Sequence, residues 1–314
     1  MLNFLYAFDK NYNTQALVSI YSVLQNITEK INLYLILDDT NIDISIPSKI
    51  KNHEKLNTIA IKKIDVNEKL YNLKESHVSK ATYYRLFISD LFDDKKLKFA
   101  YLDSDIICVS NPAFLIRNQF DDMRTENKFI GFADELYRHQ YSEPFNRLNM
   151  KGDKYFNAGV MLVDFLNWDK NNLTKKSLDA VNELKDKVKF WDQDILNSII
   201  DGNYLSLDSR LNYRTSYVDQ NKSIKNLTFI HYSGKSKPWD IGGAIEEFSD
   251  VYQAYYKDLF EKEYHLVCRN RKNSINKLFK NLLGLYKHQN LYFYKYLFKS
   301  IFVILKKENY HSLP

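Results

Sequence analysis

The beginning of the chain contains the alternation of strands and helices that decides the fold: LNFLYAF (residues 2–8), QALVSIYSVL (residues 15–24) and INLYLIL (residues 31–37). The first and third stretches are short apolar runs, which are typical of buried strands. The second has apolar residues at helical spacing, which predicts a helix packed on a sheet. A helix over 47–56 and a strand over 58–64 continue the alternation. This order indicates an α/β fold, with a mostly parallel sheet flanked by helices on both faces.

The rest of the chain continues this pattern and places polar residues after the strands. Further strands are expected at 98–102, 129–133, 157–165 and 227–232, and helices at 82–91 and 192–200. Polar residues stand at the ends of several strands: Asp9, Asp103, Asp105, Asp134 and His231. Ligands of such sheets bind beyond the carboxyl ends of the strands. The recurrence therefore predicts one common site.

The composition is that of an ordinary globular protein of one large or two small domains. Of the 314 residues, 45% are hydrophobic and 27% are charged. The two cysteines, Cys108 and Cys268, are far apart in the sequence, which favours free thiols in a reducing compartment. The first nine residues lack a basic segment and end at Asp9, so they indicate a first strand rather than a secretory signal.

The positive charge of the protein is concentrated near its C-terminus. Residues 269–307 contain ten Lys and Arg, no acid and eight aromatic residues, so the remaining chain has 35 basic against 39 acidic residues. The longest apolar stretch there, 296–305, is too short to span a bilayer. A basic, aromatic, helical tail is typical of attachment to an anionic membrane surface. The alternatives are a helical subdomain packed on the body and, less favoured because the body is acidic, nucleic-acid binding.

Asp103-Ser104-Asp105 is the strongest candidate for metal binding. In an extended segment, residues two apart point to the same side, so both carboxylates can face one cation. Hard divalent ions such as Mg²⁺ and Mn²⁺ prefer these oxygens and leave positions open for substrate phosphates. The alternative is a common acidic surface turn.

Three other segments carry candidate ligand-binding groups. After the strand ending at Ile230, His231 offers an imidazole, Gly234 allows close backbone approach, and Lys237 can neutralise a diphosphate. The alternative is a basic surface turn. Small residues in Asn157-Ala158-Gly159 permit a ligand to lie close, and Asp192-Gln193-Asp194 begins a helix, where the alternative for Asp192 is an N-cap. Arg85 is a candidate phosphate clamp or a surface salt bridge.

Together these motifs, in this order, resemble glycosyltransferase family 8. The residues that carry the resemblance are 7–12, 77–85, 103–105, 156–160, 192–194 and 231–239. The family includes bacterial lipooligosaccharide galactosyl- and glucosyltransferases and glycogenin. The resemblance covers residues 1–265 and implies a GT-A type catalytic domain, with 266–314 as the basic helical tail. It also implies a retaining, metal-dependent enzyme that uses a UDP-sugar.

The resemblance also implies a role for each matching residue. The uracil and ribose would be held by Ala7, Asp9, Asn11 and Tyr12, and Mn²⁺ (or Mg²⁺) by Asp103, Asp105 and His231. Gly234 and Lys237 would hold the diphosphate, with Ser104 at the variable centre of the aspartate motif. The donor sugar would be surrounded by Arg85, Asn157, Ala158, Asp192 and Gln193, and the acceptor side would carry Asp134 and His77. Residues 138–150, where an acceptor-covering loop would lie, match no pattern.

The implied reaction moves galactose or glucose from its UDP-sugar, with an α-linkage, onto a cell-surface glycan or glycolipid. The expected location is the cytoplasmic face of the plasma membrane. Candidate nucleophiles for double displacement are Gln193, Asp192 and Asp194, whereas a front-face route needs none. Two other classes remain: a nucleotidyltransferase, for which an early Gly-rich phosphate loop is missing, and a catalytically silent sugar-nucleotide-binding relative, although the three candidate metal ligands are present.

Overall fold

The central sheet is mostly parallel, as predicted. The computed structural model describes residues 1–65, 80–216, 223–244, 247–267, 271–283 and 291–306. The strand order of the main sheet is β3-β2-β1-β4-β7-β6-β8. The parallel half contains β1 (Leu2–Ala7), β2 (Ile31–Asp38), β3 (Leu56–Ile64) and β4 (Lys98–Leu102). Their carboxyl ends therefore lie along one edge, where Asp9 and Asp103 follow β1 and β4.

The other half of the sheet contains one strand of opposite direction. Strand β7 (Lys154–Asp164) runs antiparallel to both β4 and β6 (Ile130–Tyr137), and the short β8 (Leu205–Ser206) is parallel to β6. The prediction that the strand beginning at Phe129 ends before Asp134 is wrong. Pairing with β7 continues to Tyr137, so Asp134 lies within the strand.

A second, three-stranded sheet lies at the same edge. It contains β5 (Ile106–Cys108), β10 (Phe229–His231) and β9 (Tyr213–Arg214), in the order β5-β10-β9. Because β5 directly follows the turn at 103–105 and pairs with β10, this small sheet holds two separate motifs together.

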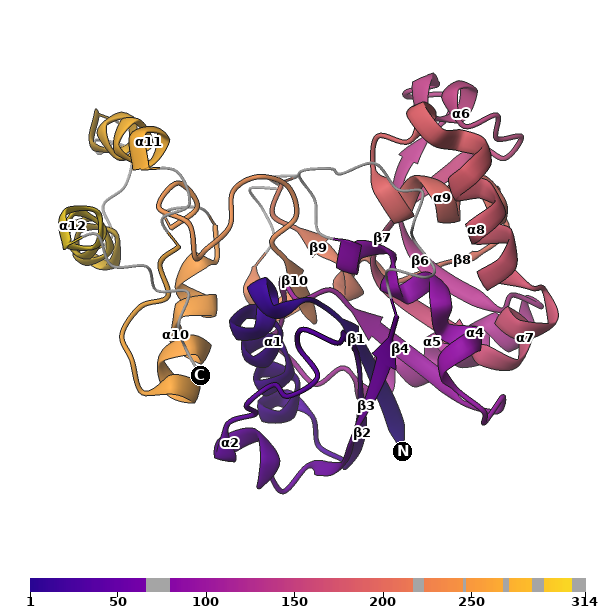
Figure 1. Cartoon of the computed structure of the whole chain (residues 1–314), viewed down its shortest axis with the longest axis horizontal. Coiled ribbons are helices and arrows are strands. Elements are labelled where there is room, and N and C mark those ends of the chain that lie inside the picture. The colour runs from indigo at the N-terminus through magenta and orange to yellow at the C-terminus, as the bar shows by residue number, and fades with distance from the viewer. Residues whose placement is uncertain (66–79, 217–222, 245–246, 268–270, 284–290, 307–314) are drawn as a thin grey trace.

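Helices cover both faces of the main sheet, as expected (Figure 1). On one face lie α1 (Asn13–Asn26), α5 (Ala113–Thr125) and α10 (Ser249–Phe260), which share a core with the small sheet. On the other lie the 3₁₀ segment η2 (Lys80–Phe87), α4 (Ile88–Leu91), α7 (Phe165–Lys170), α8 (Leu173–Leu184) and α9 (Trp191–Ile200). The short α6 (Glu143–Arg147) follows β6. Further 3₁₀ turns are η1 (Lys10–Tyr12), η3 (Lys185–Lys187), η4 (Ser209–Leu211) and η5 (Ile224–Asn226).

Two predicted helices differ from the structure. The helix expected over 47–56 is reduced to α2 (Ser48–Lys51), because local turn hydrogen bonds from His53 to Ile50 and from Leu56 to His53 follow it. Most of the segment 82–91 is 3₁₀ rather than α-helical.

The C-terminal region forms two helices, α11 (Arg271–Leu283) and α12 (Leu291–Lys306), which lie beside α10 at the end of the molecule opposite α6–α9 (Figure 1). Lys299 of α12 forms an ion pair with Glu263 at 3.2 Å. The preceding Leu266 and Val267 are buried, and the Val267 amide donates to the Trp239 carbonyl. Within the described ranges, no helix has the length and hydropathy needed to cross a bilayer.

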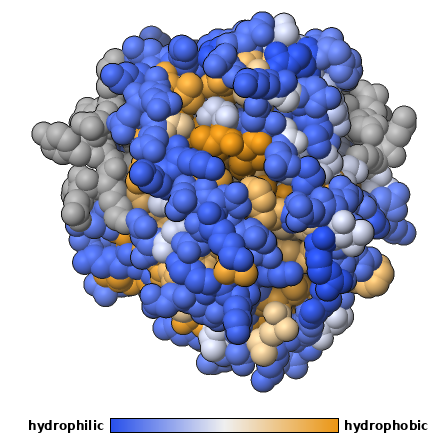
Figure 2. All heavy atoms as spheres, turned by 90° about the vertical axis from the view of Figure 1, so that its right-hand side faces the viewer, coloured by the Kyte–Doolittle hydropathy of each residue, from blue (hydrophilic) through white to orange (hydrophobic). Residues whose placement is uncertain are grey.

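Large apolar side chains are exposed mainly on these two helices. They are Ile275, Phe279, Leu283, Tyr294, Phe298, Phe302 and Leu305. The face at the opposite end of the molecule is largely hydrophilic, with smaller apolar areas between the polar side chains (Figure 2). The buried Cys108 is a free thiol, and Cys268 lies outside the described residues.

Candidate active site

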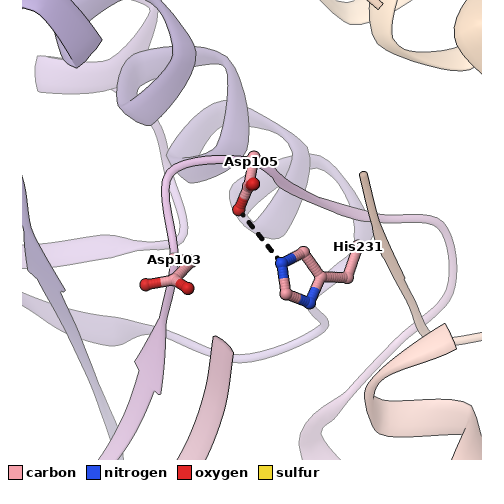
Figure 3. A group of neighbouring side chains, drawn as sticks. All are labelled: Asp103, Asp105 and His231. Carbon is pink, nitrogen blue, oxygen red and sulfur yellow. Dashed lines mark ion pairs between the residues drawn. The ribbon is translucent and has the colours of Figure 1, made fainter. Parts of the chain in front are cut away.

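Asp103, Asp105 and His231 form a cluster whose candidate ligand atoms all lie within 4.8 Å of one another (Figure 3). Backbone pairing assembles it. The Asp103 amide donates to the Gly159 carbonyl of β7, and Ile106 pairs with His231 across the small sheet. The turn between β4 and β5 thus presents both carboxylates to the imidazole.

Gly159 makes room for the imidazole. A Cβ atom at this position would lie 2.3 Å from His231 Cε1, which is far inside van der Waals contact. The small residues predicted to admit a ligand therefore also admit the side chain of a candidate metal ligand. Two carboxylates and an imidazole are a donor set that suits Mn²⁺ or Mg²⁺, so the residues present fit a divalent cation.

Asp105 lies between two basic groups. Its Oδ1 is 3.3 Å from His231 Nε2, and its Oδ2 is 2.5 Å from Lys237 Nζ. Burial alone would raise the pKa of Asp105, but the positive charge of the Lys237 ammonium group holds it well below its ordinary value. Lys237 also donates to the Tyr232 carbonyl at 2.6 Å. The motif that follows β10 therefore supplies a cation to the aspartate turn.

Arg85 is buried between two carboxylates rather than exposed in a surface salt bridge. Its Nη2 lies 2.5 Å from Asp103 Oδ1, and its Nε lies 3.0 Å from Asp192 Oδ2, a charge contact without hydrogen-bond alignment. Its Nη1 donates to the Ala158 carbonyl at 2.7 Å, and the guanidinium stands over the Tyr101 ring. Arg85 thus contacts three parts of the site: the aspartate turn through Asp103, the start of α9 through Asp192, and β7 through Ala158.

The two aspartates at the start of α9 have different surroundings. Burial raises the pKa of Asp192 to about 7, although Arg85 opposes this shift. Asp194 instead accepts the amides of Lys189 and Phe190, which precede the helix. The N-cap position of α9 is Phe190, which makes no side-chain cap hydrogen bond, so the N-cap alternative for Asp192 is wrong. The side chain of Asp194 also contacts Arg147 at 2.7 Å.

The side-chain carboxamide of Gln193 makes four hydrogen bonds to other groups of the protein. Its Oε1 accepts from Asn157 Nδ2 and from the Ala158 amide, both at 3.1 Å. Its Nε2 donates to Glu135 Oε2 at 2.9 Å and to the Tyr155 hydroxyl at 3.2 Å. All polar positions of the carboxamide are thus engaged.

Asp134 and its neighbour Glu135 point to different partners. The carboxylate of Asp134 accepts from the hydroxyls of Tyr204 at 2.6 Å, Tyr137 at 2.7 Å and Ser206 at 3.0 Å. Glu135 reaches Gln193 and forms an ion pair with Arg214 of β9. Of the two, Glu135 is the one that contacts residues near the Asp103–Asp105–His231 cluster, through Gln193 and Arg214.

The N-terminal loop lies next to the motif after β10. Asp9 caps η1 by accepting the Asn11 amide at 2.8 Å, and Ala7 ends β1. The ring of Tyr12 meets Trp239 edge to face, with centroids 6.4 Å apart. The predicted base-binding and diphosphate-binding segments are therefore neighbours, and Gly234 takes the left-handed conformation, with φ of 82°, in the latter.

Comparison with known proteins agrees with this arrangement. A solved structure of the galactosyltransferase LgtC, bound to donor and acceptor sugar analogues, matches with a TM-score of 0.68 at 22% identity, covering 82% of this chain and 96% of LgtC. GlyE from Streptococcus pneumoniae matches with a TM-score of 0.56 at 21% identity, covering 84% and 64%. The fold is thus the GT-A glycosyltransferase fold.

Sequence comparison gives the family. The model of glycosyl transferase family 8 matches residues 3–241, and the chain belongs to this family of glycosyltransferases. A lipopolysaccharide 1,3-galactosyltransferase of Salmonella typhimurium is 29% identical over 77% of this chain and 74% of its own length. An Escherichia coli lipopolysaccharide 1,2-glucosyltransferase is 28% identical over 76% and 73%. General stress protein A of Bacillus subtilis is 26% identical over 74% and 85%.

Most residues predicted for the site lie in this region, whereas His77 lies outside the described residues. Ser104 is buried in the turn between the two aspartates. Sequence reasoning missed Glu135, Asn212 and Arg214. None follows a long apolar strand, and the two-residue strand β9 is too short to show a pattern.

Proposed function

We propose that this glycosyltransferase is a retaining, UDP-sugar-dependent enzyme that transfers galactose or glucose, with an α-linkage, to a cell-surface glycan or glycolipid. The observation that supports it most is the Asp103–Asp105–His231 group, with Lys237 against one side and Arg85 against the other. Relatives named as lipopolysaccharide glucosyl- and galactosyltransferases support the hexose and the type of acceptor.

Each part of the donor has a proposed set of contacts. Ala7, Asp9, Asn11 and Tyr12 hold the uracil and ribose, and Gly234 and Lys237 hold the diphosphate near Ser104. Asp103, Asp105 and His231 hold Mn²⁺ or Mg²⁺, which supplies positive charge to the leaving diphosphate. Arg85, Asn157, Ala158, Asp192 and Gln193 surround the sugar.

The hydrogen bonds of Gln193 favour front-face transfer. Both the carbonyl oxygen and the amino group of its carboxamide are hydrogen-bonded by the protein. Gln193 therefore serves as a fixed hydrogen-bonding residue beside the sugar rather than as a nucleophile. The acceptor oxygen bonds to the anomeric carbon on the side from which the diphosphate leaves. The hydroxyl proton passes to the departing diphosphate, and Lys237 stabilises the remaining negative charge. Asp134, with Glu135 beside it, is assigned to the acceptor side; His77, which has the same assignment from the sequence, lies outside the described residues.

The C-terminal helices provide the proposed membrane contact. Exposed aromatic side chains and lysines alternate on α12, as at Phe298 and Lys299. Such a surface suits the headgroup region of an anionic leaflet. A peripheral position on the cytoplasmic face of the plasma membrane would bring the site to a lipid-linked acceptor.

The experiment that tests the proposed function is incubation with Mn²⁺ and a panel of UDP-sugars, measuring UDP release with water as acceptor. We expect release of UDP from UDP-galactose or UDP-glucose and no release of GDP from GDP-glucose, which keeps the sugar and changes only the base. Binding of UDP-sugar without release would identify a silent relative. Release of pyrophosphate from a nucleoside triphosphate and a sugar phosphate would identify a nucleotidyltransferase.

A further inference from the structure

A chain of hydrogen-bonded polar side chains connects strand β6 with the Asp103–Asp105–His231 cluster. From outside inward its members are Glu135, Gln193, Asn157, Asn212 and His231. They come from five separate segments of the chain. Asn157, Asn212 and His231 are each at least nine-tenths buried, so their hydrogen bonds are made with one another rather than with solvent.

The direction of the outer bonds is fixed by groups that have only one possible role. The Ala158 amide can only donate, so the atom of Gln193 that faces it is Oε1. The carboxylate of Glu135 accepts, so the atom facing it is Nε2. The Gly159 amide likewise donates to Asn157 at 3.1 Å and identifies Oδ1 of that side chain. Asn157 Nδ2 is then directed at Gln193.

The hydrogen bonds of Asn212 likewise fix the position of the proton on the imidazole of His231. Asn157 Oδ1 also accepts from Asn212 Nδ2 at 2.9 Å, so Asn212 turns its Oδ1 toward His231 Nδ1, also at 2.9 Å. An amide oxygen can only accept, and Nδ1 must therefore carry the proton. In the neutral ring the lone pair is then on Nε2, which lies 3.3 Å from Asp105 on the side where the candidate ligand atoms converge.

We propose that Asn212 is a positioning residue that fixes the tautomer of His231, so that Nε2 is available to a divalent cation. Histidine ligands in proteins commonly donate their other ring N–H to a partner that sets ring orientation. Glu135, Gln193 and Asn157 fix Asn212 in turn, and Gly159 leaves space for the ring. This inference rests on the proposed metal-dependent function, and it makes metal affinity depend on a residue that does not touch the metal.

The test compares two substitutions of similar size. Asn212→Asp keeps an acceptor facing His231 Nδ1, whereas Asn212→Leu removes it. We expect the Mn²⁺ dissociation constant, measured from the electron paramagnetic resonance signal of free Mn²⁺, to rise about 10–100-fold in Asn212→Leu and far less in Asn212→Asp. Asn171→Leu is the control, because the part-buried Asn171 also donates to a protein carbonyl, that of Asn167, but follows α7 and has no contact with the small sheet among the hydrogen bonds described. Equal loss in this control would overturn the specific role of Asn212.

Nitrogen NMR of the metal-free protein, with ¹⁵N-labelled histidine, gives a second readout. The His231 signal is assigned by its absence in His231→Ala. We expect the Nδ1-protonated form in the native protein and in Asn212→Asp, and a mixture of tautomers in Asn212→Leu. A native ring that carries its proton on Nε2 and none on Nδ1, or an unchanged tautomer in Asn212→Leu, would overturn the inference. Failure of the native protein to bind Mn²⁺ would count against the proposed metal site, while the NMR result would still decide the role of Asn212.

Discussion

Oδ2 of Asp105 lies 2.5 Å from the ammonium group of Lys237. The other oxygen of the same carboxylate lies 3.3 Å from His231 Nε2. One side chain therefore connects the candidate metal ligands with the cation assigned to the diphosphate. Changes at Asp105 and at Lys237 should have separable effects, because only Asp105 belongs to the proposed metal-binding cluster.

The first prediction concerns Asp105→Asn. We expect this variant to lose transfer, because a neutral amide is a poor ligand for a hard cation. It should bind UDP more weakly than the native protein when Mn²⁺ is present, but no more weakly in EDTA. Calorimetry with and without Mn²⁺ measures the difference. Asp121→Asn, at an exposed pair with Arg124, is the control. Full activity of Asp105→Asn, or of the native enzyme in EDTA, would refute the metal assignment.

The second prediction concerns Lys237→Met. The variant keeps a long side chain but lacks the charge that faces the leaving diphosphate. We expect the rate of UDP release to fall about 10²–10³-fold, the usual effect of removing one group that stabilises developing negative charge. Lys235→Met is the control, because Lys235 is an exposed residue of the same loop. A matching loss in both variants would show that Lys237 has no special role.

The third prediction uses the pH dependence of stability. Burial raises the pKa of Asp192 to about 7 from an ordinary value of 3.8, so between these values the folded protein keeps a proton that the unfolded chain has released. The free energy of unfolding should therefore fall with rising pH in this window, by up to about 1.4 kcal/mol per pH unit. Asp192→Asn removes this dependence.

Urea unfolding of the metal-free protein at several pH values checks it. The stability of Asp192→Asn relative to the native protein should increase from about pH 4 to about pH 7 and stay constant above. A difference that does not change with pH would mean that Arg85 keeps the carboxylate of Asp192 ionised throughout.

The sequence was most informative where a long apolar run precedes a polar motif. Strand β4 has the predicted bounds, Lys98–Leu102, and the paired aspartates follow it directly. The direction of β7 was not predictable, because an apolar run shows burial but not direction. Its antiparallel pairing with β4 depends on contacts between distant segments.

Irregular pairing of β6 explains why the sequence did not show where the side chain of Asp134 lies. The register of β6 against β7 shifts between Phe132 and Ala133 and again between Asp134 and Leu136. Bulges of this kind change which side chains share a face. The sequence marked the right place in the chain, but could not show that Glu135 rather than Asp134 contacts Gln193. The burial of Arg85 between Asp103 and Asp192 was equally hidden, because it depends on tertiary packing.

The fourth prediction concerns stereochemistry. If the acceptor attacks from the side of the leaving group, the α-configuration of the donor is kept. Proton NMR of the first product, recorded before any later anomeric exchange, should show an α-linkage. A β-linked product would remove the protein from the retaining class and would contradict the role proposed for Gln193.

The last prediction concerns the C-terminal helices. Each Lys or Arg near an anionic leaflet contributes about 1 kcal/mol, and the region from Arg269 to Lys307 has ten of them. The full chain should therefore co-sediment with vesicles containing phosphatidylglycerol, and not with phosphatidylcholine vesicles. Binding should weaken as added salt shortens the Debye length, which is about 8 Å at physiological ionic strength. Phe298→Ser combined with Phe302→Ser should weaken binding at unchanged charge, whereas Phe114→Ser, at a still more exposed position on α5, should not.

A chain truncated before α11 tests whether the C-terminal helices are needed for membrane binding, and Val267 must be retained in it. The Val267 amide donates to the Trp239 carbonyl at 2.6 Å, and Trp239 contacts Tyr12, so a chain ending before Val267 would disturb the proposed base-binding loop. A chain ending after Val267 keeps that bond and every residue assigned to the donor. It should release UDP at the native rate and no longer sediment with vesicles. If this truncated chain instead fails to fold, as judged by circular dichroism, α11 and α12 are a packed part of the body. If the full chain ignores anionic vesicles, the membrane role is wrong.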